Sequence, residues 1–338
     1  MWYNNRKDVE GQKVAIGQTK ISLPPFDSNI IEKKRGIVTL LTIYCALFSE
    51  AQEIIKRFQL KKETRNTHFQ VFSDTKEEIR LVLTGVGAIA AATAVAELSS
   101  CYLPKQTDLL LNFGSCAARD EVPIGKVFVC NKLTEECSGR TFYPDMLYHH
   151  PFLEAELISR PKIQSLNEME SDCTKEMAWK ETRLYDMEAA AVYQAGNYYY
   201  GPHQMIFLKV VSDHGCKEDR KDGKMTDMQA QMSALMQDIA EPVSQYIETL
   251  CKICHTKKKE SQTQAMFRKQ AEEEAEKFGK QLHCSFVMQK ELLQLLLYWK
   301  LTGTDDTAIF DEYRRQGRLP AKDKREGKKI LDELKERL

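Results

Sequence analysis

Short apolar runs alternate with helical patterns between residues 36 and 255. Each run is rich in β-branched and aromatic residues, and the segments between the runs have helical spacing, which is typical of βα units. The predicted strands span residues 37–47, 79–85, 108–114, 126–130 and 204–213. The pattern therefore predicts an α/β fold with a mixed, mostly parallel central sheet flanked by helices.

The two ends of the chain follow other patterns. Residues 1–35 are polar with little periodicity and are expected to form an N-terminal arm, whereas residues 256–338 are charged and predict a C-terminal helical extension. Within this extension, residues 287–301 place leucine and aromatic side chains around more than half of a helix. Such a helix should be buried on several sides, against the α/β domain, within a small helical domain of its own or against a protein partner.

Charge and cysteine content narrow the choice of partners and compartment. The chain has 49 basic and 49 acidic side chains, so no net field favours nucleic acid as a partner. The N-terminus is polar where a signal peptide needs an apolar core, and the longest apolar run, residues 37–48, is too short for a bilayer. With ten scattered cysteines that read as reduced thiols, we expect a cytoplasmic protein without a membrane segment.

One cysteine pair stands apart, near the end of a predicted helix. Cys251, Cys254 and His255 have the spacing of covalent haem attachment and could also supply three zinc ligands. No second such pair occurs in the sequence, so two half-buried thiols on one helix face are the favoured interpretation. We expect neither a metal ion nor a cofactor.

Polar and glycine residues follow several of the predicted strands. They are Glu50, Gly85, Gly114, Ser115 and Asp213. Ligands of open α/β sheets bind outside the carboxyl ends of the strands, so these residues are expected to meet there. Each also suits an ordinary role: Glu50 in the first turn of a helix, the glycines in tight turns, and Ser115 or Asp213 as a cap.

The segment 183–196 raises a separate question, because Asp186 and Glu188 stand in a run of small apolar residues. An unpaired carboxylate is costly to bury. Glu188 is therefore either the partner of a buried Arg or Lys, or a residue that binds a ligand.

Several segments together resemble the nucleoside phosphorylase superfamily, most closely the 5'-methylthioadenosine/S-adenosylhomocysteine nucleosidases. In chain order they span residues 43–54, 83–98, 109–129, 185–196 and 208–215. The resemblance covers about residues 36–255 and implies that family's fold, a catalytic domain and a homodimer. Gly85 and Gly114 match glycines of the family's substrate site.

The resemblance implies hydrolysis of the N-glycosidic bond of a purine nucleoside similar to methylthioadenosine or S-adenosylhomocysteine. Asp213 would be the general acid for the leaving base. Glu50 would activate the attacking water, which Ser115 would help to position. Glu188 would accept hydrogen bonds from the ribose hydroxyls, with Met187 packed on the sugar.

Two alternatives to hydrolysis stay open. Phosphorolysis needs cationic donors for phosphate, but Asn112 stands where the hexameric phosphorylases have an arginine, and Glu50 would repel phosphate. Arg119, Arg140 and Arg183 keep phosphorolysis possible because the sequence does not place them. The other alternative is a nucleoside-binding module without catalysis, whose helical tail binds a protein partner.

The sequence leaves the base site undefined. Between Phe152 and Tyr185 the family places a strand and a loop that clasp the purine, whereas this chain has a charged segment without a clear match. The base and the 5' substituent are therefore open. Phe142 or Tyr143 could stack on a base, and His214 could tune the neighbouring acid.

Overall fold

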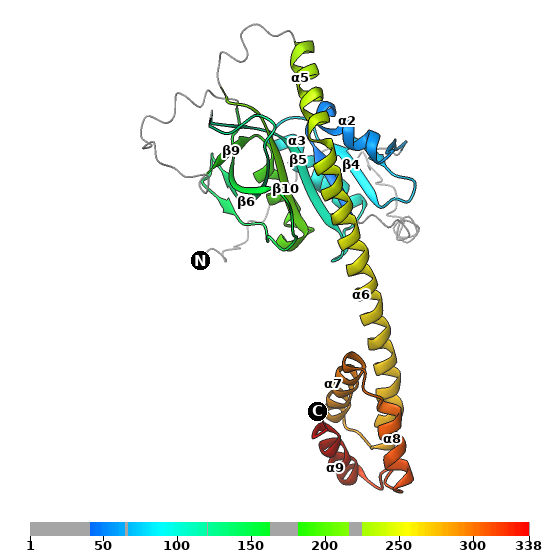
Figure 1. Cartoon of the computed structure of the whole chain (residues 1–338). Helices are drawn as coiled ribbons and strands as arrows, with labels where there is room; N and C mark the ends of the chain where they lie inside the picture. The colour runs from blue at the N-terminus through cyan, green and yellow to red at the C-terminus, as the bar shows by residue number, and fades with distance from the viewer. Residues whose placement is uncertain (1–40, 65–66, 120, 163–181, 216–224, 338) are drawn as a thin grey trace, which may run out of the picture. The chain divides into compact units, whose positions relative to one another are not determined.

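A ten-stranded mixed sheet with helices on its faces forms the α/β part of the described chain. Figure 1 shows the strands and the helices around them. The structure is a computed structural model that describes residues 41–64, 67–119, 121–162, 182–215 and 225–337. The N-terminal arm predicted at residues 1–35 and most of the charged segment before Tyr185 lie outside these ranges. The α/β class and the mixed sheet predicted from the sequence are confirmed.

The strands of the sheet, in chain order, are β1 (Leu41–Cys45), β2 (Lys61–Lys62), β3 (Gln70–Ser73), β4 (Ile79–Leu83), β5 (Leu109–Ala118), β6 (Val127–Glu135), β7 (Thr141–Phe142), β8 (Leu153–Ser159), β9 (Arg183–Asp186) and β10 (Met205–Asp213). Their spatial order is β10-β6-β8-β9-β5-β1-β4-β3-β2, with β7 paired to β6. Because β10 also pairs with β5, strands β5, β9, β8, β6 and β10 close into a ring. Strands β4, β1, β5 and β10 are parallel, so their carboxyl ends meet at one edge.

The predicted strands correspond to β1, β4, β5, β6 and β10, but the end of β5 was placed too early. Gly114 and Ser115 lie inside β5, which corrects the prediction that they form a turn after it. The strand continues because its backbone stays paired, with β10 on one side up to Ala117 and with β9 on the other side at Ala117 and Ala118. Ser115 is therefore not a helix N-cap.

Two apolar layers cover the sheet because alternate strand residues point to opposite faces. Ile43 of β1 faces a cluster that includes helices α2 (Phe48–Arg57), α5 (Met225–Asp238) and α6 (Ala240–Gln281). Tyr44, the next residue, faces a second cluster with α3 (Ala88–Cys101) and α4 (Ala189–Gly196). The 3-10 turn η3 (Pro202–Gln204) leads into β10.

Helix α6 is one continuous helix that runs through residue 255 (Figure 1). The prediction that the Cys251–His255 segment lies near a helix end is therefore wrong. Residues 256–278 contain no Gly or Pro and consist largely of good helix formers, so they prolong the helix. Cys254 is buried and Cys251 packs against the same apolar cluster on the sheet, which agrees with the interpretation as packed thiols.

The C-terminal helices have an apolar core of their own. Helices α7 (Phe286–Thr302), α8 (Asp306–Arg315) and α9 (Lys324–Lys335) pack with the last turns of α6. In this core the rings of Phe278 and Phe310 stack with centroids 3.6 Å apart, and Trp299 is buried beside them. Residues 287–301 thus lie in a helical cluster of their own, one of the three arrangements expected. Within the described ranges, no helix has both the length and the hydropathy needed to cross a membrane.

Candidate active site

An open pocket of about 200 Å³ lies where the carboxyl ends of the parallel strands meet. It is lined by residues that follow β1, β4 and β8 and by the ends of β5, β9 and β10. The predicted site residues in its wall are Glu50, Ser115, Met187, Glu188 and Asp213. Gly85 and Gly114 do not line the pocket. Gly114 lies against Glu50, and Gly85 is part of the turn that contains Gly87, whose N–H bonds Glu188.

Glu50 is held rigidly at the start of α2. Its Oε2 accepts hydrogen bonds from the backbone N–H groups of Ala46 at 3.1 Å and Leu47 at 3.0 Å. Its Oε1 accepts from the N–H of Ser115 at 2.8 Å and from the Ser115 hydroxyl at 2.7 Å. Glu50 therefore occupies the first turn of a helix, which is the ordinary role predicted for it. Its carboxylate also connects α2 to β5.

Three glycines help to position Glu50 and Glu188, one by close approach and two by their backbone conformation. A Cβ at Gly114 would lie 3.2 Å from Oε1 of Glu50, so the bare backbone lets β5 approach the carboxylate. Gly85 and Gly87 have φ angles of 77° and 98°, which favour glycine in the turn before α3. The turn directs the N–H of Gly87 at Oε1 of Glu188, 2.7 Å away.

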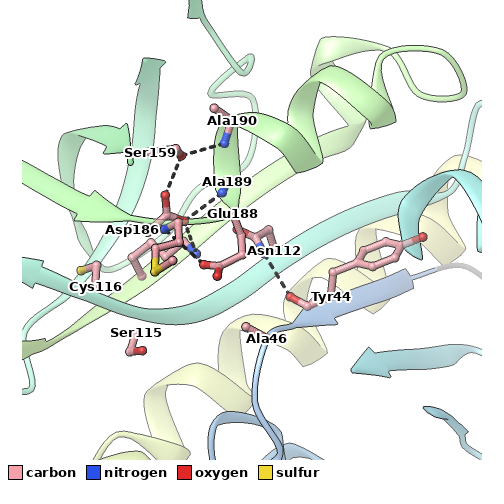
Figure 2. A network of polar contacts seen from close by, with 12 residues as sticks. Tyr44, Ala46, Asn112, Ser115, Cys116, Ser159, Asp186, Glu188, Ala189 and Ala190 are labelled. Carbon is pink, nitrogen blue, oxygen red and sulfur yellow. Dashed lines mark hydrogen bonds and ion pairs between the residues drawn. The ribbon is translucent and has the colours of Figure 1, made fainter. Parts of the chain in front are cut away.

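The segment 183–196 contains two acidic residues, Asp186 and Glu188. The buried cation Lys209 forms its ion pair with Asp186. Lys209 Nζ lies 2.9 Å from Oδ2 of Asp186, and both side chains are almost fully buried. Asp186 also accepts hydrogen bonds from the hydroxyl of Ser159 at 2.6 Å and from the N–H of Ala189 at 2.9 Å (Figure 2). Lys209 was not predicted from the sequence, although a single lysine inside the apolar strand "MIFLKVVSD" is a signal for a buried ion pair.

Glu188 lies in the pocket wall. Figure 2 shows it beside Asp186 of this ion pair. Besides the bond from Gly87, its Oε2 accepts a longer hydrogen bond of 3.3 Å from the N–H of Met187. Burial, together with the charge of Asp186, raises the pKa of Glu188 to about 7, although Lys209 opposes the rise. Glu188 is thus a desolvated acceptor whose charge changes near neutral pH.

This raised pKa predicts a pH-dependent effect of Glu188→Gln on stability. The folded protein binds a proton at Glu188 up to about pH 7, whereas the unfolded chain releases it near the usual value of 4.5. Wild type therefore loses stability as pH rises from about 5 to 8, and the glutamine variant lacks this loss. Denaturant titrations should show the variant gaining free energy of unfolding relative to wild type over that range.

The matched control for this measurement is Glu121→Gln, because Glu121 is exposed and lies outside the pocket wall. Its free energy of unfolding relative to wild type should stay flat with pH. A Glu188→Gln variant whose relative stability is equally flat would show that Glu188 is not desolvated in the folded protein.

Asp213 is the last residue of β10 and lines the pocket. Strand β9, which ends two residues before Glu188, pairs with the other side of β5. Its Oδ1 accepts a hydrogen bond from the N–H of Gly215 at 2.9 Å, and its Oδ2 accepts one from the Ser212 hydroxyl at 2.9 Å. The neighbouring His214 places Nε2 2.9 Å from the carbonyl oxygen of Val122. Local turns therefore fix the direction of the Asp213 carboxyl group.

The cations in the described pocket wall are not the ones that the sequence suggested. Arg119, Arg140 and Arg183 are not among the described lining residues, whereas Arg160 and Lys162 are. Both follow β8, a half-exposed strand that the sequence analysis did not recognise.

Three further side chains considered in the sequence lie outside the described pocket wall. Asn112 is buried and donates a hydrogen bond of 3.2 Å to the carbonyl of Tyr44 (Figure 2). Phe142 stacks on Tyr193 with ring centroids 5.0 Å apart, and Tyr143 is exposed. Neither aromatic residue is placed to stack on a ligand in this pocket.

The architecture is the nucleoside phosphorylase-like fold. No family model matches the sequence, and no curated protein does. A variant of the Helicobacter pylori nucleosidase MTAN, with 5'-methylthioadenosine in its active site, shares 12% identity at a TM-score of 0.50. The match covers 62% of this chain and 99% of that one. At such identity the likeness establishes the fold alone.

Two more solved structures have similar values. The 5'-methylthioadenosine/S-adenosylhomocysteine nucleosidase of S. pneumoniae, with a transition-state inhibitor, is 16% identical at a TM-score of 0.48, covering 64% of this chain and 99% of that one. Futalosine hydrolase of Helicobacter pylori is 14% identical at a TM-score of 0.49, with the same coverage of 64% and 99%.

Proposed function

We propose that this chain hydrolyses the N-glycosidic bond of a purine nucleoside and releases the free base. The observation that carries the proposal is the convergence of Glu50, Glu188 and Asp213 from three distant segments on one pocket. Cleavage of this bond leaves an oxocarbenium-like sugar and a poor leaving group, so it needs an acid at the base and an activated water at the sugar. The three carboxyl groups match these needs.

Glu50 is proposed to hold and deprotonate the attacking water. Three of its four hydrogen bonds come from backbone N–H groups and fix the carboxylate. The fourth comes from the hydroxyl of Ser115, which can rotate. Rotation of this hydroxyl toward a water molecule frees one acceptor position on Glu50 for the same water.

Glu188 is proposed to accept hydrogen bonds from the ribose hydroxyls, with Met187 packed on the sugar. Charge-assisted hydrogen bonds from hydroxyls to a buried carboxylate are strong, and they strengthen as positive charge develops on the ring. The Gly87 N–H bonded to Oε1 keeps this carboxylate in place. The binding energy would then act on the transition state as well as on the ground state.

Phosphorolysis is the second candidate, and Arg160 and Lys162 in the pocket wall are the observation that favours it. A phosphate dianion needs such donors. Against it, Glu50 presents a fixed negative charge at the position proposed for the nucleophile, and a phosphate there would be repelled. Hydrolysis is therefore the function that the geometry supports better.

The finer proposals follow from the resemblance to the nucleosidases. They are a methylthioadenosine- or S-adenosylhomocysteine-like substrate, a homodimer, and a division into a catalytic domain at residues 36–255 and a helical region at 256–338 that could bind a protein partner. The separate apolar core of helices α7, α8 and α9 supports a distinct helical region, and the continuous helix α6 runs across the proposed boundary.

Asp213→Asn tests the role of the general acid. The variant should fold normally and release base about 10²-fold more slowly or worse, because an amide cannot deliver a proton to the leaving base. The turnover number and the melting temperature should be measured together.

Asp145→Asn is the matched control, because Asp145 is exposed and outside the pocket wall, and it should behave as wild type. Turnover by Asp213→Asn within about threefold of wild type would exclude Asp213 as the acid.

A further inference from the structure

Arg160 is a buried cation in the wall of the pocket, directly after β8. It is 8% exposed, and its guanidinium carbon lies 4.2 Å from the centre of the Tyr185 ring. Its backbone N–H donates to the carbonyl of Asp186 at 2.8 Å, which ties it to the end of β9. Two neighbouring strands therefore fix its position.

The guanidinium is incompletely satisfied. Oε1 of Glu136 lies 2.7 Å from Nε, which forms an ion pair. Nη1, by contrast, has no hydrogen-bond partner within the described part of the chain. Buried donors are normally paired, so an unpaired donor in a pocket wall points to a ligand that carries an acceptor.

The sheet register relates Arg160 to the proposed acid. Tyr185 of β9 and Asp213 of β10 both pair with Ala117, from opposite sides of β5. They therefore stand at the same level of the sheet, about 10 Å apart for two strand spacings. A purine held at one edge by Asp213 extends toward Tyr185 and the guanidinium stacked on it.

We propose that Arg160 selects nucleosides whose base carries a ring carbonyl oxygen, such as the 6-oxopurines hypoxanthine and guanine, over adenine. This inference rests on the proposed N-glycosidic hydrolysis, and it replaces the adenine base of the methylthioadenosine-like substrate with an oxopurine. A guanidinium only donates, so it suits the carbonyl oxygen of an oxopurine and opposes the amino group that adenine has at the same position. Arginine pairs with O6 and N7 of guanine, whereas adenine is matched by Asn or Gln. The described pocket wall contains neither Asn nor Gln.

The test is a comparison of kcat/KM for matched nucleosides, using the full chain. Inosine and adenosine form one pair, and 5'-methylthioinosine and 5'-methylthioadenosine form another, so each pair differs only in the base. Wild type should prefer the oxopurine member of each pair. Arg160→Met should lower this preference about 10- to 100-fold, as expected for loss of one bidentate contact. Arg183→Met, an exposed arginine outside the described pocket wall, should leave it unchanged.

Further variants separate base selection from a structural role in neutralising Glu136. The double variant Arg160→Met/Glu136→Gln removes the ion pair as a whole and should regain stability but not the oxopurine preference. Arg160→Lys keeps the charge and loses the planar fork, so it should not restore the preference either. Recovery of the preference in the double variant would overturn the inference.

Other outcomes also decide against it. Wild type that prefers adenosine, or an unchanged ratio in Arg160→Met, would exclude base selection by Arg160. An equal loss for inosine and adenosine 5'-monophosphates, with an unchanged ratio for the free nucleosides, would show that Arg160 binds an anion. If no nucleoside is cleaved, the proposed hydrolysis fails, and the affinities for hypoxanthine and adenine are measured by calorimetry to test base selection separately. Tighter binding of hypoxanthine that Arg160→Met abolishes supports the inference. Equal binding of the two bases overturns the inference as well.

Discussion

Glu50→Gln is expected to lower base release by about 10³-fold while nucleoside binding changes little. Glutamine cannot take a proton from the attacking water. It would also place an amide NH₂ against N–H donors, because both oxygens of Glu50 accept from the backbone. A loss of about 1–3 kcal/mol in stability should accompany the kinetic effect. Turnover should be measured by release of free base, and affinity by calorimetry at a temperature where the variant is folded.

Glu53→Gln is the matched control, because Glu53 lies one turn further along the same helix α2 and outside the described wall of the pocket. It should retain wild-type turnover. If Glu50→Gln loses nucleoside binding in the same proportion as turnover, Glu50 contacts the substrate and does not activate water.

Lys209→Met is expected to lower the free energy of unfolding by about 3–5 kcal/mol, the cost of leaving one partner of a buried ion pair alone. Burial by itself would lower the pKa of Lys209, but Asp186 and Glu188 outweigh it and raise that pKa above its usual value. The lysine is therefore charged at neutral pH, and removing it isolates two carboxyl groups. Denaturant unfolding measured at neutral pH checks this.

Lys132→Met is the control for this prediction. Lys132 pairs with Glu156 at 2.8 Å, but its side chain is 38% exposed, so the loss should be at most about 1 kcal/mol. Addition of Asp186→Asn to Lys209→Met should recover part of the stability, because the two positions are directly coupled. A Lys209→Met variant as stable as Lys132→Met would contradict the buried pair.

The central strands could be predicted because burial on both faces gives continuous apolar runs, as in β1 and β10. Their boundaries could not all be predicted. The small polar residues Gly114 and Ser115 suggest a turn, yet pairing on both sides keeps them in β5. Helix α6 shows the opposite case: the sequence predicted a helix end near His255, but the helix-forming residues that follow carry the helix through.

Some residues of the candidate site could likewise be predicted from the sequence, and others could not. Glu50 and Asp213 could be predicted as neighbours because parallel strands deliver them to one edge. Arg160 could not, since β8 alternates between buried and partly exposed residues and has no long apolar run. Lys209 pairs with Asp186 across two strands, β10 and β9, that are not adjacent in the sheet because β5 lies between them.

Incubation of the full chain with a panel of purine nucleosides, with and without inorganic phosphate, tests the central claim most directly. The free base and the sugar product should be quantified together by chromatography. Hydrolysis predicts equal base release in both conditions, with free ribose or its 5'-substituted form as the sugar product. Release that requires phosphate and yields a sugar 1-phosphate, or no release from any nucleoside, would contradict the account.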